Sequence, residues 1–233
     1  MAIAALSTWL RAQAVWWLGW LLAAVWFGAA ELPAWWFAVQ TVVMALSYAV
    51  LVPILRAGRR AADVVTVARF GGLLAVIWLA AAGRPWSWFA AVAVVLLDLV
   101  DGAVARRCGG SPQGAVLDME TDQFTVLGLA TLVAAAGGGG HVLLLPALRY
   151  VFVLAMWWAG APAHEPKPVD GDNRRGRTVC ACVLIALLVA LWPNLPPPVG
   201  DVVTAVAVLL LAWSFAGDAG FLLAQLRGPR SRA

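Results

Sequence analysis

Four aspartates lie between residues 98 and 122, in an otherwise apolar part of the chain: Asp98, Asp101, Asp118 and Asp122. A charged side chain in a membrane-embedded helix costs at least about 2.5–3.5 kcal/mol on insertion scales, so such residues are functional candidates by default. The first pair is three residues apart and the second pair is four apart, and on a helix both spacings put two carboxylates on one face. The pattern therefore predicts two helices that each present a pair of carboxylates.

The connection between these two acidic helices is short and contains Gly109, Gly110 and Pro112. A short connection makes the helices antiparallel neighbours, which brings both acidic faces together at one end of the hairpin. Facing carboxylates repel one another unless a cation lies between them. Oxygen ligands suit Mg²⁺, Mn²⁺ or Ca²⁺, and four carboxylates suffice for two ions about 4 Å apart, an arrangement used in phosphoryl chemistry.

The composition indicates a membrane protein with several spans. Of the 233 residues, 63% are hydrophobic and 12% are charged, whereas a soluble domain carries about 25% charged residues. The net charge of +4 is dispersed among loops and does not indicate a nucleic-acid partner. The three cysteines, Cys108, Cys180 and Cys182, do not make a disulfide framework. The expected fold class is an all-α, polytopic transmembrane helical bundle.

About 20 apolar residues are needed to cross the hydrocarbon core of a membrane. By this length criterion the sequence has eight candidate spans. They cover residues 14–30, 34–55, 64–82, 86–104, 115–136, 141–159, 179–192 and 199–226. Basic residues concentrate on alternate connections, with clusters at residues 56–60, 106–107 and 167–177. Because cytoplasmic loops carry an excess of Lys and Arg, we expect both termini and the connecting end of the acidic hairpin to be cytoplasmic.

Two glycines and an arginine accompany the acids. Gly102 directly follows Asp101, and Gly114 precedes Asp118 by about one turn. Each glycine costs roughly 1 kcal/mol in a helix relative to alanine, so this placement indicates clearance for a ligand or close packing of two helices. Arg106 lies one turn beyond Gly102 and carries the planar fork that can bind a phosphate through two hydrogen bonds.

The run Asp98-x-x-Asp101-Gly102-x-x-Ala105-Arg106, followed by Gly114-x-x-x-Asp118-x-x-x-Asp122, resembles the signature of the CDP-alcohol phosphatidyltransferase family. An outlying stretch, Asp63-x-x-Thr66-x-x-Arg69, resembles the Asn-x-x-Thr-x-x-Arg that opens the first core helix of that family, with Asp in place of Asn. The resemblance implies an integral membrane enzyme with a six-helix core. We expect this core to span residues 61–233, preceded by an N-terminal extension with two transmembrane helices at residues 1–60.

The resemblance also implies a reaction in phospholipid biosynthesis. An acceptor hydroxyl would attack the β-phosphorus of a CDP-linked lipid alcohol, with CDP-diacylglycerol as the expected donor, and CMP would be released. The four aspartates would hold two Mg²⁺ or Mn²⁺ ions, and Asp122 would also act as the general base. The residues expected to bind the CDP-alcohol are Asp63, Thr66, Arg69, Gly102, Arg106, Ser111 and Gly114.

Three arginines are expected to bind the acceptor. Arg149 lies well inside an apolar span, where it is expected to balance the acids or an anionic substrate. A basic patch that resembles one in the family adds Arg175 and Arg177. These cations favour a phosphorylated acceptor, such as glycerol 3-phosphate or inositol phosphate, over neutral inositol, serine or an amino alcohol. Glu120 is rotated away from its acidic neighbours on the helix, so we expect it outside the metal cage.

The expected partners are the CDP-linked lipid donor, the small polar alcohol and membrane lipids. Members of the family are often dimers, which makes a homodimer an expected assembly.

Two other classes of membrane protein also place acids in their spans. Intramembrane aromatic prenyltransferases bind Mg²⁺-pyrophosphate with two aspartate-rich motifs, but those motifs usually lie on non-adjacent helices and lack a Gly-x-x-Ala-Arg element. A divalent-cation transporter or channel predicts acids that spread through the bilayer or recur in both halves of the chain. Here the four aspartates lie in one hairpin with no second copy, a pattern that favours the phosphatidyltransferase.

Overall fold

The computed structural model describes residues 2–57, 60–108, 111–160 and 174–227, and this part of the chain contains helices but no strand. The prediction of an all-α, polytopic bundle is confirmed. Two short 3₁₀ turns, η1 (Ala29–Glu31) and η2 (Gly140–Leu143), accompany the longer helices. The α-helices are α1 (Ala2–Trp26), α2 (Ala34–Leu55), α3 (Ala61–Ala81), α4 (Ser87–Cys108), α5 (Pro112–Ala135), α6 (Leu144–Trp158), α7 (Arg174–Ala190) and α8 (Pro197–Arg227).

Local sequence signals set the ends of several helices. Ser111 caps α5, because its Oγ accepts a hydrogen bond from the backbone N–H of Gly114 at 2.9 Å, and Pro112 occupies the first turn, where its missing N–H costs nothing. At the start of α3, the Asp63 carboxylate accepts a hydrogen bond from the backbone N–H of Arg60 at 3.4 Å. These two capped ends lie next to the predicted acidic site.

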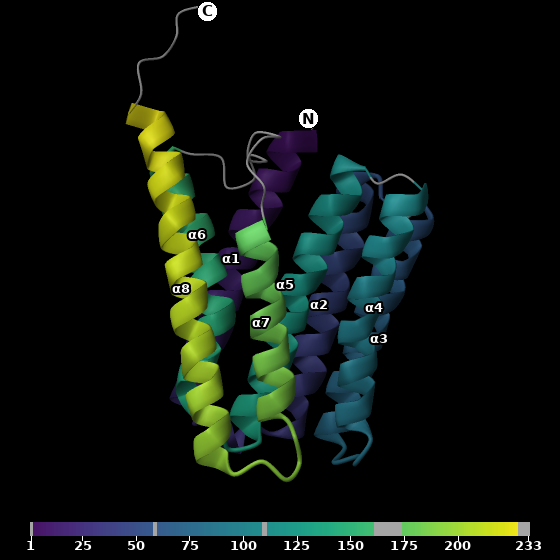
Figure 1. Cartoon of the computed structure of the whole chain (residues 1–233), viewed down its shortest axis with the longest axis vertical. Coiled ribbons are helices and arrows are strands. Elements are labelled where there is room, and N and C mark those ends of the chain that lie inside the picture. The colour runs from purple at the N-terminus through teal and green to yellow at the C-terminus, as the bar shows by residue number, and fades with distance from the viewer. Residues whose placement is uncertain (1, 58–59, 109–110, 161–173, 228–233) are drawn as a thin grey trace, which may run out of the picture.

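The helices run side by side along the long axis of the molecule, with α5 in the interior (Figure 1). The N-terminal end of α1 and the last turns of α8 lie at the same end of the bundle. Every residue of α5 from Phe124 to Ala134 is buried, which is typical of a helix enclosed by neighbours on all sides. The end of α5 that carries the acids lies where α3, α4 and α7 also contribute residues to one cavity.

Five segments of the described chain are long and apolar enough to cross a membrane: Ala34–Leu55, Ala61–Ala81, Ser87–Ala105, Gly140–Trp158 and Pro197–Gly220. This is fewer than the eight spans expected from the sequence. The acids of α5 reduce its apolar character, α7 has only 17 residues, and α1 carries Arg11 and Gln13. All three helices nevertheless lie alongside the others in the same bundle (Figure 1). Which end faces the cytoplasm stays a prediction.

Helices α1 and α2 pack directly against the rest of the bundle, and buried hydrogen bonds join α2 to α5. Gln40 donates to the hydroxyl of Thr131 at 3.0 Å, and the hydroxyls of Tyr48 and Thr121 lie 3.0 Å apart. The division into an extension at residues 1–60 and a core at residues 61–233 stays a prediction. In space the two parts share a continuous interior.

Close packing between α3 and α4 depends on a glycine. A Cβ atom added to Gly72 would lie 2.9 Å from Cγ2 of Val94 on α4, whereas a Cβ added to the adjacent Gly71 would meet nothing within 4 Å. Small residues at such crossings let helix backbones approach closely inside a membrane. Gly72 therefore belongs to the helix interface, and Gly71 faces away from it.

We predict that Gly72→Leu destabilises the protein by about 1–3 kcal/mol, the usual range for overpacking a close-packed interior. Thermal unfolding of the purified protein in detergent micelles measures the effect. Gly71→Leu is the matched control, because it makes the same chemical change one residue away in open space, and it should unfold at or above the wild-type temperature. Equal unfolding temperatures for the two variants would contradict the assignment of Gly72 to the interface.

Candidate active site

Three of the predicted metal ligands come together at one end of the bundle. Asp98 on α4 and the pair Asp118 and Asp122 on α5 each offer one carboxylate oxygen, and these oxygens all lie within 4.8 Å of one another. The antiparallel hairpin of α4 and α5 that the sequence predicted brings these carboxylates together. Asp101 and Arg106 belong to α4, but their side chains lie outside the described residues, so their predicted roles stay predictions.

A buried arginine holds the three carboxylates together. The guanidinium of Arg69 on α3 donates a hydrogen bond to Asp98, a second to Asp118 at 2.7 Å and a third to Asp122 at 2.9 Å. Only 2% of the Arg69 side chain is exposed. Because the arginine is buried while the three carboxylates stay 24–40% exposed, the attraction is stronger than at an open surface, and solvent still screens part of it. The sequence placed Arg69 among the donor-binding residues, whereas the structure places its head group inside the carboxylate cluster.

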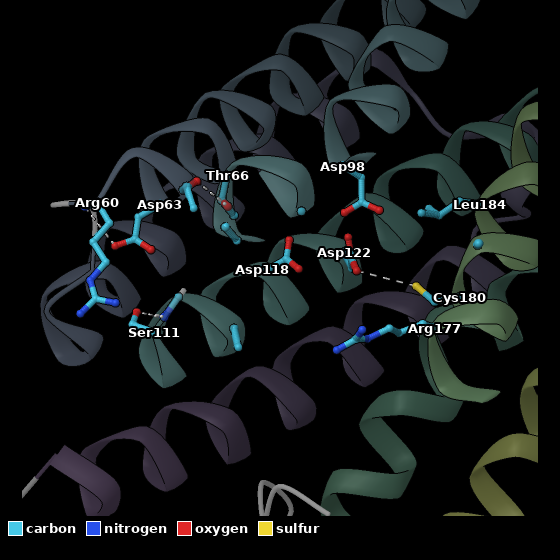
Figure 2. Close-up of a pocket in the computed structure, with 16 residues that line it drawn as sticks. Arg60, Asp63, Thr66, Asp98, Ser111, Asp118, Asp122, Arg177, Cys180 and Leu184 are labelled. Carbon is cyan, nitrogen blue, oxygen red and sulfur yellow. Dashed lines mark hydrogen bonds between the residues drawn. The ribbon is translucent and has the colours of Figure 1, made fainter. Parts of the chain in front are cut away.

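A cavity of about 440 Å³ adjoins the cluster, within the size range of small-molecule sites. Figure 2 shows that its side chains come from the ends of α3, α4, α5 and α7 and surround the three aspartates. The lining residues are Arg60, Ala62, Asp63, Thr66, Asp98, Gly102, Ala105, Ser111, Gly114, Ala115, Asp118, Asp122, Arg177, Cys180, Ala181 and Leu184. Asp63, Thr66, Gly102, Ser111 and Gly114 therefore share one cavity with the acids, as a common donor site requires.

Gly114 lies where two helix ends meet. A Cβ atom at this position would lie 2.5 Å from Oδ1 of Asp63 and 3.1 Å from Oγ of Ser111. The missing side chain thus lets the start of α3 approach the start of α5. Of the two sequence-based explanations for this glycine, clearance for a ligand and close helix packing, the second operates here.

Helix α7 supplies one wall of the cavity, and only one of its lining residues was expected from the sequence. Arg177 was expected, but Cys180 and Leu184 were missed, although spacings of three and four residues put all three on one helix face. Cys180 Sγ lies 3.8 Å from Oδ2 of Asp122, and Figure 2 shows this contact beside the aspartates. Arg60 on the opposite side of the cavity was also missed; its position next to the Asp63 cap was the available signal.

A family model described as CDP-alcohol phosphatidyltransferase matches residues 59–215, more than half of the chain. The chain belongs to the CDP-alcohol phosphatidyltransferase family. No curated protein and no solved structure matches it. The resemblance carried by the aspartate motif is therefore confirmed at the level of the family.

Membership in the CDP-alcohol phosphatidyltransferase family settles the class of reaction. Its members are transferases that move a phosphate-containing group from a CDP-alcohol to an acceptor alcohol. Together with the five apolar helices, the family makes this chain an integral membrane protein. The matched residues include the whole carboxylate cluster, whereas α1 and α2 lie outside the match.

In this phosphatidyltransferase, two of the three arginines expected to bind the acceptor lie elsewhere. Arg149 on α6 donates a hydrogen bond to the buried carboxylate of Glu120 at 2.9 Å. Arg175 donates to Asp218 on α8 at 2.6 Å and stacks over the ring of Trp213. Among the described residues that line the cavity, neither of these arginines appears. Their role toward the acceptor stays a prediction, and their visible contacts are between helices.

We predict that Arg149→Met destabilises the protein by about 3–5 kcal/mol, because it removes the guanidinium that pairs with the buried Glu120 carboxylate. Thermal unfolding in micelles measures the loss. The double variant Arg149→Met/Glu120→Leu should recover most of it, since replacing a buried ion pair by apolar groups is often neutral. Wild-type stability of the single variant would contradict a structural role for this pair.

Proposed function

We propose that this member of the CDP-alcohol phosphatidyltransferase family transfers the phosphatidyl group of CDP-diacylglycerol to the hydroxyl of a small phosphorylated alcohol and releases CMP. The observation that carries the proposal is the cluster of three carboxylates that opens onto a cavity edged by Arg60 and Arg177. The aspartates would hold the metal and accept the proton, while the two flanking arginines would bind phosphates. We place the reaction at the cytoplasmic face of the membrane, because Lys and Arg are concentrated in the connections at that end of the predicted spans.

The donor set fits a hard divalent cation. Asp98, Asp118 and Asp122 supply only oxygen ligands, and the Arg69 guanidinium among them shows that the cluster accommodates positive charge. We infer that these aspartates, together with Asp101, hold two Mg²⁺ or Mn²⁺ ions. When bound, such ions offset the charge of the donor pyrophosphate and orient an in-line displacement.

Residues of the chain then act on the acceptor and its proton. The acceptor oxygen forms a bond to the β-phosphorus, while the bond from that phosphorus to the bridging oxygen breaks and CMP leaves with the electron pair. The acceptor proton passes to Asp122. Its Oδ1 accepts a hydrogen bond from Arg69 at 2.9 Å, and its Oδ2 lies toward the α7 wall, near Cys180. We therefore assign the proton to Oδ2, which serves as a base once the acceptor hydroxyl is polarised.

A lipid donor is supported by an apolar groove on the same pair of helices. Trp88 and Val92 of α4 face three residues of α7, together with Trp192 and Leu195, around a second cavity of about 370 Å³. On α7 the groove begins at Ile185, directly after Leu184 of the polar cavity. From Asp98 to Trp88 helix α4 rises roughly 15 Å. A donor headgroup bound at the carboxylates would therefore direct an acyl chain along the apolar groove between α4 and α7. Trp88 and Trp192 pack edge to face at its far end, with ring centroids 4.4 Å apart.

A phosphorylated acceptor is supported by Arg177. This exposed residue lines the cavity from α7, and Figure 2 shows its side chain extending toward Asp118 and Asp122. Its guanidinium can bind a phosphate through two parallel hydrogen bonds. An acceptor phosphate held there would keep the acceptor hydroxyl on the side of the cavity where Asp122 lies.

We predict that Asp122→Asn abolishes turnover while donor binding is largely retained, because the amide cannot take the acceptor proton. The measurement is CMP release by the purified protein with CDP-diacylglycerol and Mg²⁺ or Mn²⁺, across a panel of phosphorylated and neutral acceptors. Binding of labelled donor to the same preparations separates lost chemistry from lost affinity. Turnover close to that of the wild type would remove Asp122 as the base.

The acceptor panel also tests the substrate. Metal-dependent CMP release that one acceptor stimulates would support the proposed reaction. Donor binding without release for every acceptor would point to a different CDP-alcohol or an inactive enzyme. A preparation that binds no CDP-alcohol at all would overturn the proposal.

We predict that Arg177→Ala raises KM for the phosphorylated acceptor by about tenfold or more and leaves kcat within about twofold, since a charge-assisted hydrogen bond contributes about 1.5–3 kcal/mol. Steady-state kinetics with the acceptor varied measures both constants. Thr178→Ala, a change at the exposed neighbour on the same helix, is the control for disturbance of α7. An unchanged KM, or an enzyme that uses only neutral acceptors, would exclude this role.

A further inference from the structure

A cluster of three aromatic side chains packs behind the carboxylates, on the side where α2 meets α3 and α5. Tyr48 of α2 stacks on Phe70 of α3, with ring centroids 3.9 Å apart and an angle of 6° between the planes. Phe124 of α5 contacts both rings, at centroid distances of 6.3 Å from Tyr48 and 5.5 Å from Phe70. All three side chains are buried. The group therefore joins three helices at one level of the bundle.

This level is that of the proposed metal site. Phe70 directly follows Arg69, which holds the three carboxylates. On α5, the hydroxyl of Thr121 lies 3.0 Å from the hydroxyl of Tyr48, and Thr121 directly precedes Asp122. Tyr48 thus contacts the residue next to the internal cation and the residue next to the proposed base.

The direction of the Tyr48 hydrogen bond follows from its surroundings. Thr121 Oγ1 donates its own proton to the carbonyl oxygen of Leu117 at 2.8 Å. Its oxygen can then only accept from Tyr48, so the tyrosine hydroxyl is the donor. Because both groups are buried, breaking this bond is costly, and it therefore restrains the axial position and the rotation of α5 relative to α2.

We propose that Tyr48 is a positioning residue for the proposed metal site, although it lies outside the region that matches the family. Its ring sets α3, and hence Arg69, while its hydroxyl sets α5, and hence Asp118 and Asp122. The spacing between the guanidinium and the carboxylates follows from these two contacts. This role rests on the proposed function, because it acts through the carboxylates that would hold the metal. It also gives helix α2 a function within the enzyme.

The same interface contains a matched contact farther from the acids. Thr131 on α5 is buried like Thr121, donates within its own helix to the carbonyl oxygens of Gly128 at 2.9 Å and Leu127 at 3.1 Å, and accepts a hydrogen bond from Gln40 of α2 at 3.0 Å. It lies about two and a half turns beyond Asp122, roughly 13 Å along the helix. Loss of either hydroxyl should disturb the packing of α2 against α5 similarly, but only the loss at Thr121 should reach the acids.

The experiment measures Mn²⁺ binding to the full chain in detergent micelles, by the electron paramagnetic resonance signal of free Mn²⁺, together with thermal unfolding. Tyr48→Phe, which keeps the stacked ring, and Thr121→Val should each raise the Kd for Mn²⁺ by about threefold to tenfold, the range that one hydrogen bond supports. The double variant Tyr48→Phe/Thr121→Val should match the single variants, because all three lack the same bond. Thr131→Val should leave the Kd unchanged and lower the unfolding temperature about as much as Thr121→Val.

Each other result counts against the role of Tyr48. A wild-type Kd in Tyr48→Phe, additive effects in the double variant, or equal Kd changes for Thr121→Val and Thr131→Val would overturn it while leaving the metal site in place. Failure of the wild-type protein to bind Mn²⁺ would overturn the metal site itself, and the positioning role with it.

Discussion

The mutual repulsion of three carboxylates in a membrane protein is the constraint on which the rest of this structure depends. Asp98, Asp118 and Asp122 converge within 4.8 Å, and without positive charge that convergence would push α4 and α5 apart. Arg69 provides the charge from a third helix, with only 2% of its side chain exposed. A single cation therefore links α3, α4 and α5 at the end of the bundle where the cavity lies. Because the fork of a guanidinium has fixed geometry, it sets the separation of the acids as well as their charge balance.

Helix α5 runs from the carboxylate cluster into the interior of the bundle. It bears two of the acids near its start, yet from Phe124 onward every residue to Ala134 is buried. Two glycines permit the close approaches that this requires. At Gly114 the helix meets the Asp63 cap of α3, and a Cβ at Gly128 would lie 3.0 Å from Cδ1 of Ile77, also on α3. The position of the acids is thus determined along the whole length of α5, by packing at one end and by charge at the other.

The sequence predicted the acidic hairpin through three- and four-residue intervals on helices joined by a tight connection. It predicted other residues of the cavity lining, such as Asp63, Thr66 and Ser111, through the resemblance to the family. It did not predict what depends on the rotation of distant helices. Arg69 was assigned to the donor and lies among the acids, and Arg149 was assigned to the acceptor and pairs with Glu120. Both arginines had several acids within reach of their helices, and a linear pattern does not say which acid each one faces. The contacts of α2 with α5 could not be predicted for the same reason, because nothing in the sequence pattern relates Tyr48 to Thr121.

Helices α4 and α7 enclose two cavities of different chemistry at two levels along their length. Near the acids the facing residues are small, with Gly102 and Ala105 on α4 and Ala181 on α7, and the helices enclose a polar cavity. Farther along, larger side chains such as Trp88 and Ile185 line an apolar groove. Small residues at a helix crossing normally bring backbones together, but here they border open volume, which sacrifices packing energy. Elsewhere in the bundle, buried hydrogen bonds join α5 to α2, a helix outside the region that matches the family.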